Sequence, residues 1–113
     1  MIDMPNNPGT PTISIKRLEE KIKLADTEKL CGVGFHYGTD GNNLHTFEQA
    51  VKHPRVFGLK IYCNHTTGEL LIEDHTKLDE IFKAWESTKP ILVHAEGKQL
   101  ATALELAKKY RRK

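Results

Sequence analysis

The sequence predicts an α/β protein in which four strand–helix units build a parallel sheet. Short apolar runs alternate with amphipathic segments along all 113 residues, and most of the apolar runs are continuous rather than alternating. A strand buried on both faces needs a continuous apolar run, and a parallel sheet needs a crossover helix after each strand. We therefore expect a single domain, residues 1–113, with helices covering a parallel sheet.

The first two units are predicted as follows. A short strand at residues 1–4 leads into a turn-rich loop, and Thr12 or Ser14 then caps a helix. Its buried face is marked by apolar residues at helical spacing, namely Ile15, Leu18, Ile22 and Ala25. A buried strand is expected over residues 30–36, followed by a turn and a short helix through residues 44–51.

The last two units repeat this order. A long apolar run at residues 56–63 predicts a strand, a polar loop follows, and Thr76 is the expected cap of a third helix. The apolar face of that helix comprises Leu78, Ile81, Phe82 and Trp85. Pro90 begins a strand that ends at His94, and the last helix starts at about Lys98. That helix is expected to bury Leu100, Ala103, Leu104 and Ala107.

Two architectures share this order of elements: a compact open α/β sheet, and half of a (β/α)8 barrel. In both, ligands gather at the carboxyl ends of the strands. Polar side chains follow the expected strands at these ends: Asn6, His36, the stretch 60–67 and His94. A site at this rim of the sheet is therefore predicted, and the other histidines are assigned to solvated loops or helix surfaces.

Composition restricts the class of protein. The chain is 38% hydrophobic and 28% charged with a net charge of +2, and no apolar run reaches the length of a membrane span, so we expect a cytoplasmic protein with no membrane partner. Five of the last six residues are basic, which suits cations at a helix C-terminus better than a nucleic-acid surface. Cys31 and Cys63 are read as small buried hydrophobic residues in a reducing compartment.

Lys60 is the unusual residue, because it lies inside the apolar strand at residues 56–63. A buried ammonium group is costly unless it is paired, deprotonated or chemically changed. The simple alternatives are a side chain that reaches solvent, or an ion pair with Glu96 or another carboxylate.

Three motifs resemble successive strand ends of the dihydroorotases, which are cyclic amidohydrolases built as metal-dependent TIM barrels. They are Asp3-Met4-Pro5-Asn6, the stretch 58–67 that reads GLKIYCNHTT, and His94-Ala95-Glu96. Their order and spacing agree over about ninety residues. The resemblance implies a partial TIM barrel of the amidohydrolase type. Hydantoinases and allantoinases are close relatives of the same barrel.

The resemblance also implies roles for five residues. Lys60 would be carboxylated and bridge two zinc ions, and His94 would bind one of them. Asn6 would hold the carboxylate of dihydroorotate or carbamoyl aspartate, although Asn7 stands where the family has threonine. Thr66 and Thr67 would act in catalysis from a loop that closes over the substrate.

Several parts of the family's site are absent from these 113 residues: a His-x-His pair, an arginine after it, a further metal-binding histidine and a catalytic aspartate. Enzymatic activity is therefore an expectation for a complete barrel, whereas the chain by itself is expected to be catalytically incomplete. The alternative is a non-catalytic half-barrel that serves binding or assembly. Because unpaired sheet edges are unstable, we expect a homo-oligomer or association with a complementary barrel segment.

Overall fold

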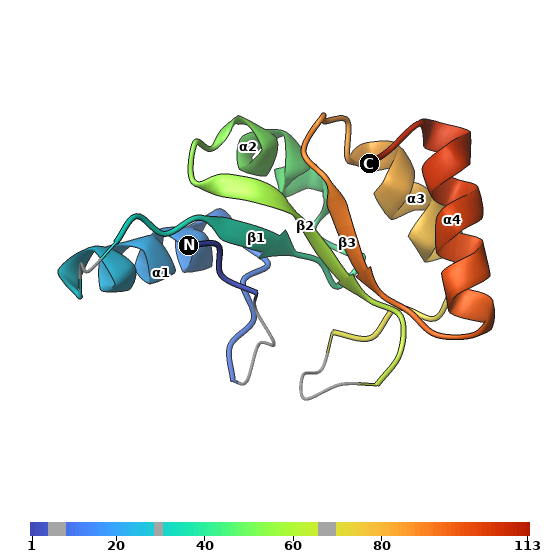
Figure 1. Cartoon of the computed structure of the whole chain (residues 1–113), viewed down its shortest axis with the longest axis horizontal. Coiled ribbons are helices and arrows are strands. Elements are labelled where there is room, and N and C mark those ends of the chain that lie inside the picture. The colour runs from blue at the N-terminus through green and yellow to red at the C-terminus, as the bar shows by residue number, and fades with distance from the viewer. Residues whose placement is uncertain (5–8, 29–30, 66–69) are drawn as a thin grey trace.

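In the residues that the structure describes, three parallel strands and four α-helices follow one another, as the alternation of apolar runs predicts (Figure 1). The structure is a computed structural model that describes residues 1–4, 9–28, 31–65 and 70–113. In chain order the elements are α1 (Ile15–Thr27), β1 (Phe35–Gly38), the short 3-10 helix η1 (Leu44–Thr46), α2 (Phe47–Lys52), β2 (Val56–Tyr62), α3 (His75–Ala84), β3 (Ile91–His94) and α4 (Lys98–Tyr110).

The strands lie in the order β1-β2-β3, so each strand pairs with the next one along the chain. The expected first strand is reduced to a single parallel bridge between Ile2 and Gly34, on the outer side of β1. The second strand begins at Phe35 rather than at residue 30 and continues to Gly38. The ladder with β2 begins at the pair Phe35 and Val56, and the residues before Phe35 form no ladder with β2 in the part of the chain that the structure describes.

One core lies between the sheet and the helices. It joins Leu18 of α1, Phe47 of α2, Phe82 of α3 and Leu106 of α4 to one face of the strands. All four helices therefore pack on the same face. Sequential strand order with helices on one face is the arrangement of a barrel segment, whereas a doubly wound open sheet carries helices on both faces.

Two of the helices begin at a side-chain cap. Ser14 accepts a hydrogen bond from the Arg17 amide at 3.2 Å, which confirms one of the two expected caps of α1. At α3 the cap is Asp74, whose carboxylate accepts from the Lys77 amide at 2.9 Å, so the expected Thr76 cap is wrong. Asp74 is extended and precedes the first helical residue, which is the backbone position that a cap requires.

Replacing this cap gives a direct test. Asp74→Ala should lower the free energy of unfolding by about 1 kcal/mol, because the amide at the third helical position loses its acceptor. Thr76→Ala is the matched control and should change stability by less than about 0.5 kcal/mol. Urea denaturation followed by circular dichroism measures both. Equal losses from the two variants would contradict the assignment of Asp74 as the cap.

α4 presents a different face from the expected one. Ala103 and Leu106 are buried, whereas Leu100 and Leu104 are 49% and 64% exposed. The prediction that Leu100 and Leu104 enter the core is therefore wrong. α4 follows the edge strand β3, so its core face is the side that meets α3, and the other flank extends past the sheet.

The basic residues at the C-terminus contact the end of α3 and the start of β3. The Arg112 guanidinium donates to the Phe82 carbonyl at 2.9 Å, close to the C-terminus of α3, where a cation is favourable. The carbonyl of Lys113 accepts the Ile91 amide at 2.7 Å, which ties the chain's end to β3. In the part of the chain that the structure describes, no helix is long and apolar enough to cross a membrane.

The two cysteines differ in environment. Cys63 is buried in the core, as expected, and burial raises the pKa of its thiol to about 11, so it is protonated at neutral pH. Cys31 is exposed, and the prediction that it is a buried hydrophobic residue is wrong. It lies ahead of the bridge at Gly34, where the chain has not yet entered the sheet.

Candidate functional site

The candidate site lies on the face of the sheet that the helices leave uncovered. Leu59, Ile61 and Cys63 point into the core beneath the helices. Because side chains alternate along a strand, Lys60 and Tyr62 lie on the opposite face. The register pairs Lys60 with Leu92 and Tyr62 with His94, so β3 delivers His94 to that same face, near the carboxyl ends of the strands.

Lys60 is 9% exposed, so the side chain is buried as its apolar neighbours predict. Burial lowers the pKa of its ammonium group, and the neighbouring Cys63 only partly opposes this. The nitrogen lies 4.8 Å from the ring centroid of Tyr62, in a cation–π contact. Among the described residues no carboxylate forms an ion pair with Lys60. The alternative that Glu96 neutralises the Lys60 ammonium group is therefore wrong.

Tyr62 joins the two expected metal ligands, and sequence reasoning missed it. Its ring contacts Lys60 on one side, and on the other it lies 6.2 Å from the ring of His94 at a tilt of 44°. Burial, followed by the negative charge of Asp3, raises the pKa of its hydroxyl, which is therefore neutral near pH 7. The strand period of two places Tyr62 beside Lys60 and could have identified it.

His94 is the last residue of β3 and is partly buried. Its carbonyl accepts the Cys63 amide at 2.8 Å, and the Asn64 side chain accepts the Glu96 amide at 2.7 Å. These two bonds fasten the end of β3 to the end of β2. Asn64, which belongs to the stretch that resembles the dihydroorotases, therefore positions the chain around His94.

His36 places a further imidazole ring on this face. It pairs with Gly58, is 6% exposed, and donates from Nδ1 to the carbonyl of Asp3 at 2.8 Å. In the neutral ring this leaves Nε2 without a proton, able to accept a hydrogen bond or bind a metal. Sequence reasoning matched His36 to no ligand position, although its place at a strand end singled it out among the remaining histidines.

The donor set supplies part of a metal site. Lys60 and His94 lie on one face and share Tyr62 as a neighbour, but the described residues contain no cluster of three His, Cys, Asp or Glu side chains. A catalytic zinc usually keeps three protein ligands. The residues present therefore fit the two-ligand portion that the resemblance implies. Asn6, Thr66 and Thr67 lie outside the described residues.

Comparison with known proteins supports the architecture. No family model matches the chain. Among solved structures it is similar to the inactive dihydroorotase-like domain of the CAD-like multifunctional protein of Chaetomium thermophilum, with a TM-score of 0.74 and 24% identity. The match covers 93% of this chain and 30% of that one. The chain therefore has the fold of part of a dihydroorotase-like domain.

Proposed function

We propose that this chain forms the part of a dihydroorotase-like cyclic amidohydrolase barrel that carries Lys60 and His94 as metal ligands, and that it is catalytically incomplete by itself. The observation that supports this most strongly is the position of Lys60. Its amine is buried on the face opposite the core, without a carboxylate partner among the described residues, and beside the strand end that carries His94.

The environment of Lys60 suits carboxylation by carbon dioxide. Only the neutral amine attacks carbon dioxide, and burial favours the neutral form by lowering the pKa. The amine nitrogen forms a bond to the carbon and releases one proton, and the product is a carbamate with two oxygen donors. When zinc is bound, it polarises the amide carbonyl and lowers the pKa of a bound water. Tyr62 would then orient the carbamate and His94, because it contacts both side chains.

In the complete barrel the proposed reaction is the interconversion of dihydroorotate and carbamoyl aspartate. Asn6 would hold the substrate's carboxylate, and Thr66 and Thr67 would bind the substrate from the loop after β2. A second candidate function, a non-catalytic assembly module, is favoured by the two-ligand donor set and by the inactivity of the similar Chaetomium thermophilum domain. Hydantoinase-like or allantoinase-like chemistry would use the same ligands on another cyclic amide.

Metal binding tests the proposal directly. After chelation and equilibrium dialysis against zinc with bicarbonate, the wild-type chain should retain zinc, measured by plasma mass spectrometry. Lys60→Met and His94→Ala should each weaken binding by about tenfold or more, because each removes one of the two donors. His45→Asn alters an exposed histidine and should leave zinc binding unchanged.

Carboxylation has its own readout. Carbon-13 NMR of the chain equilibrated with labelled bicarbonate should show a carbamate signal that Lys60→Met removes and Lys23→Met leaves in place.

Zinc binding that is equal in wild type and both site variants would refute the metal role. Hydrolysis of dihydroorotate by the isolated chain, lost in Lys60→Met, would show instead that the chain is a complete enzyme.

A further inference from the structure

Two side-chain hydrogen bonds join the chain after β2 to the chain after β3, and we name this pair of bonds the clasp. The side-chain oxygen of Asn64 accepts the Glu96 amide at 2.7 Å, and the side-chain nitrogen of Gln99 donates to the Glu73 carbonyl at 3.2 Å. Figure 1 shows the chain after β3 running past the chain before α3 on its way to α4. The clasp therefore lies at the carboxyl ends of the strands, beside the candidate site.

Both partners on the β2 side are fixed to the end of that strand. Asn64 is two residues beyond Tyr62, the last residue of β2. The Ile72 amide donates to the Tyr62 carbonyl at 2.8 Å, so the chain returns to the strand end just before Glu73. Because Lys60 and Tyr62 belong to this strand, a bond to Asn64 or to Glu73 holds its partner at a set position relative to the candidate site.

The segment between β3 and α4 depends on such bonds for its direction. Only residues 95–97 separate His94 from the first residue of α4, so the start of α4 and the position of His94 are closely linked. Gly97 occupies the N-cap position with φ +54° and has no side chain to cap the helix, although cap contacts normally fix the direction in which a chain enters a helix. Asn64 and Gln99 hold this segment instead, one bond before Gly97 and one after it.

His94 is held between the clasp and the strand. Its own carbonyl accepts the Cys63 amide at 2.8 Å, and two residues later the Glu96 amide is bound by Asn64. With the backbone fixed on both sides, the imidazole ring is kept 6.2 Å from the ring of Tyr62. Removing a group that fixes the orientation of a metal ligand commonly lowers metal affinity.

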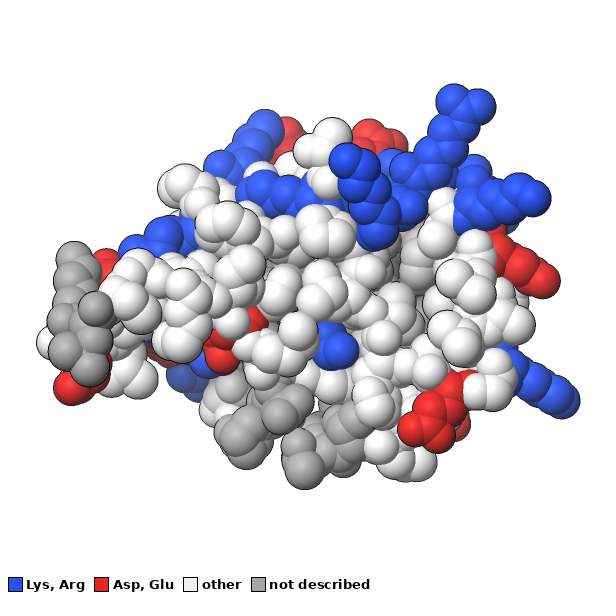
Figure 2. All heavy atoms as spheres, in the orientation of Figure 1, with Lys and Arg blue, Asp and Glu red and all other residues white. Residues whose placement is uncertain are grey.

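Charge is divided between the two ends of the sheet. Basic residues lie in the last turns of α2, α3 and α4, and Figure 2 shows many Lys and Arg side chains gathered where Figure 1 places the C-terminal end of α4. The opposite end carries exposed acidic residues, including Glu73, Asp74 and Glu96. That end suits a divalent cation, whereas the clasp is formed by neutral amide groups and should depend little on salt.

We propose that Asn64 and Gln99 are positioning residues for His94. They hold its imidazole beside Tyr62, where it can bind the metal together with Lys60. This inference rests on the proposed role of Lys60 and His94 as metal ligands. Asn64 acts as a hydrogen-bond acceptor and Gln99 as a donor, so a carboxylate can replace the amide at residue 64 but not at residue 99.

Zinc affinity, measured by equilibrium dialysis of the full chain, tests both positions. Asn64→Leu removes the acceptor and should weaken zinc binding by up to about tenfold, whereas Asn64→Asp retains an acceptor and should bind zinc at least as tightly as wild type. Gln99→Glu removes the donor and should weaken binding, although it adds the same negative charge as Asn64→Asp. A purely electrostatic effect of that charge would strengthen binding in both variants, so opposite signs identify the hydrogen bonds.

The ring contact between His94 and Tyr62 gives a readout that needs no metal. In the metal-free chain, nuclear Overhauser effects between these two rings should be present in wild type. They should persist in Asn64→Asp and become weaker in Asn64→Leu and Gln99→Glu, because only the last two variants lose a bond of the clasp.

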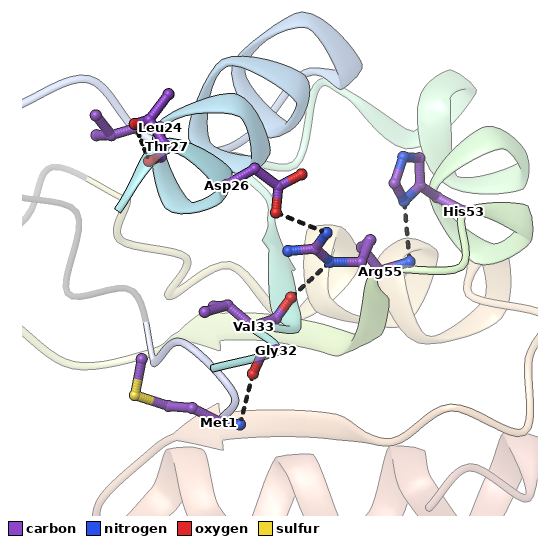
Figure 3. A network of polar contacts seen from close by, with 8 residues as sticks. All are labelled: Met1, Leu24, Asp26, Thr27, Gly32, Val33, His53 and Arg55. Carbon is purple, nitrogen blue, oxygen red and sulfur yellow. Dashed lines mark hydrogen bonds and ion pairs between the residues drawn. The ribbon is translucent and has the colours of Figure 1, made fainter. Parts of the chain in front are cut away.

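Arg55 provides the control for a general loss of stability, because it precedes β2 and lies at the opposite end of that strand. Its guanidinium donates to the Val33 carbonyl at 2.6 Å and to the Asp26 carboxylate of α1 at 3.2 Å (Figure 3). Arg55→Met removes these contacts and should lower the midpoint of urea denaturation. Zinc affinity and the ring contact of His94 should stay as in wild type.

Ring contacts equal to wild type in Asn64→Leu and Gln99→Glu would overturn the positioning role, as would a loss in Asn64→Asp as large as that in Asn64→Leu. Weakened ring contacts with unchanged zinc affinity would overturn its link to the metal. A wild-type chain that binds no zinc but shows the expected ring contacts would refute the proposed function and leave the hold of the clasp on His94 standing, so the two proposals fail separately.

Discussion

Gly58→Ala is expected to destabilise the chain by about 3 kcal/mol, the upper part of the range for overpacking, and to loosen the pairing of β2 with β3. A Cβ atom at this position would lie 2.6 Å from the carbonyl oxygen of Pro90, 3.1 Å from His36 and 3.2 Å from Leu92. The Pro90 oxygen belongs to the backbone and accepts the Leu59 amide, so it cannot move without breaking that bond. Urea denaturation measures the loss.

Gly34→Ala provides the matched control. There the added Cβ atom would lie 2.4 Å from the ring of Phe57, which is a side chain that is 47% exposed and can rotate away. We expect a loss of about 1 kcal/mol or less, within the range of ordinary substitutions. If the two variants lost equal stability, or if Gly58→Ala were neutral, the close approach of β3 to Gly58 would be wrong.

These glycines illustrate what the sequence could and could not predict about the fold. The alternation of elements, the Ser14 cap and the burial of Leu18 depend on local pattern, and the structure confirms them. The start of β1 depends on where its partner β2 begins. Such pairing joins residues far apart in the sequence, so no local pattern predicts it. The pattern of α4 was ambiguous, because Leu100 and Leu106 each belong to a helical stripe that includes Ala103. Only the position of the sheet edge decides between them.

Part of the candidate site also follows from local sequence pattern, whereas another part depends on contacts between residues far apart in the chain. The burial of Lys60 follows from its apolar neighbours, and the position of His94 follows from the end of a strand. Tyr62 is two residues from Lys60, so the alternation of side chains along a strand could have predicted that both lie on the same face. The bond from His36 to the Asp3 carbonyl joins residues 33 apart, and no local pattern indicates it.

Lys60→Met is expected to stabilise the metal-free chain at pH 7, because burial of the charged ammonium group is unfavourable. Burial holds the pKa of Lys60 below that of the unfolded chain, so the folded state binds this proton less tightly. Below the folded pKa both states are protonated, and the cost of burying the ammonium is fully present. Methionine has similar length, retains the contact with Tyr62 and carries no charge.

The advantage of methionine should therefore shrink as pH rises. Between the folded and unfolded pKa values only the unfolded chain holds the proton, so the stability of wild type increases there relative to Lys60→Met. Urea denaturation of both proteins across this range, in buffer with chelator and without carbon dioxide, measures the difference. Lys23→Met changes an exposed lysine and should show neither the stabilisation nor the pH trend. A wild-type chain more stable than Lys60→Met at neutral pH, without metal, would mean that the buried ammonium has a partner that stabilises it. Lys60 would then be a structural cation, and the carbamate proposed for it would lose its physical basis.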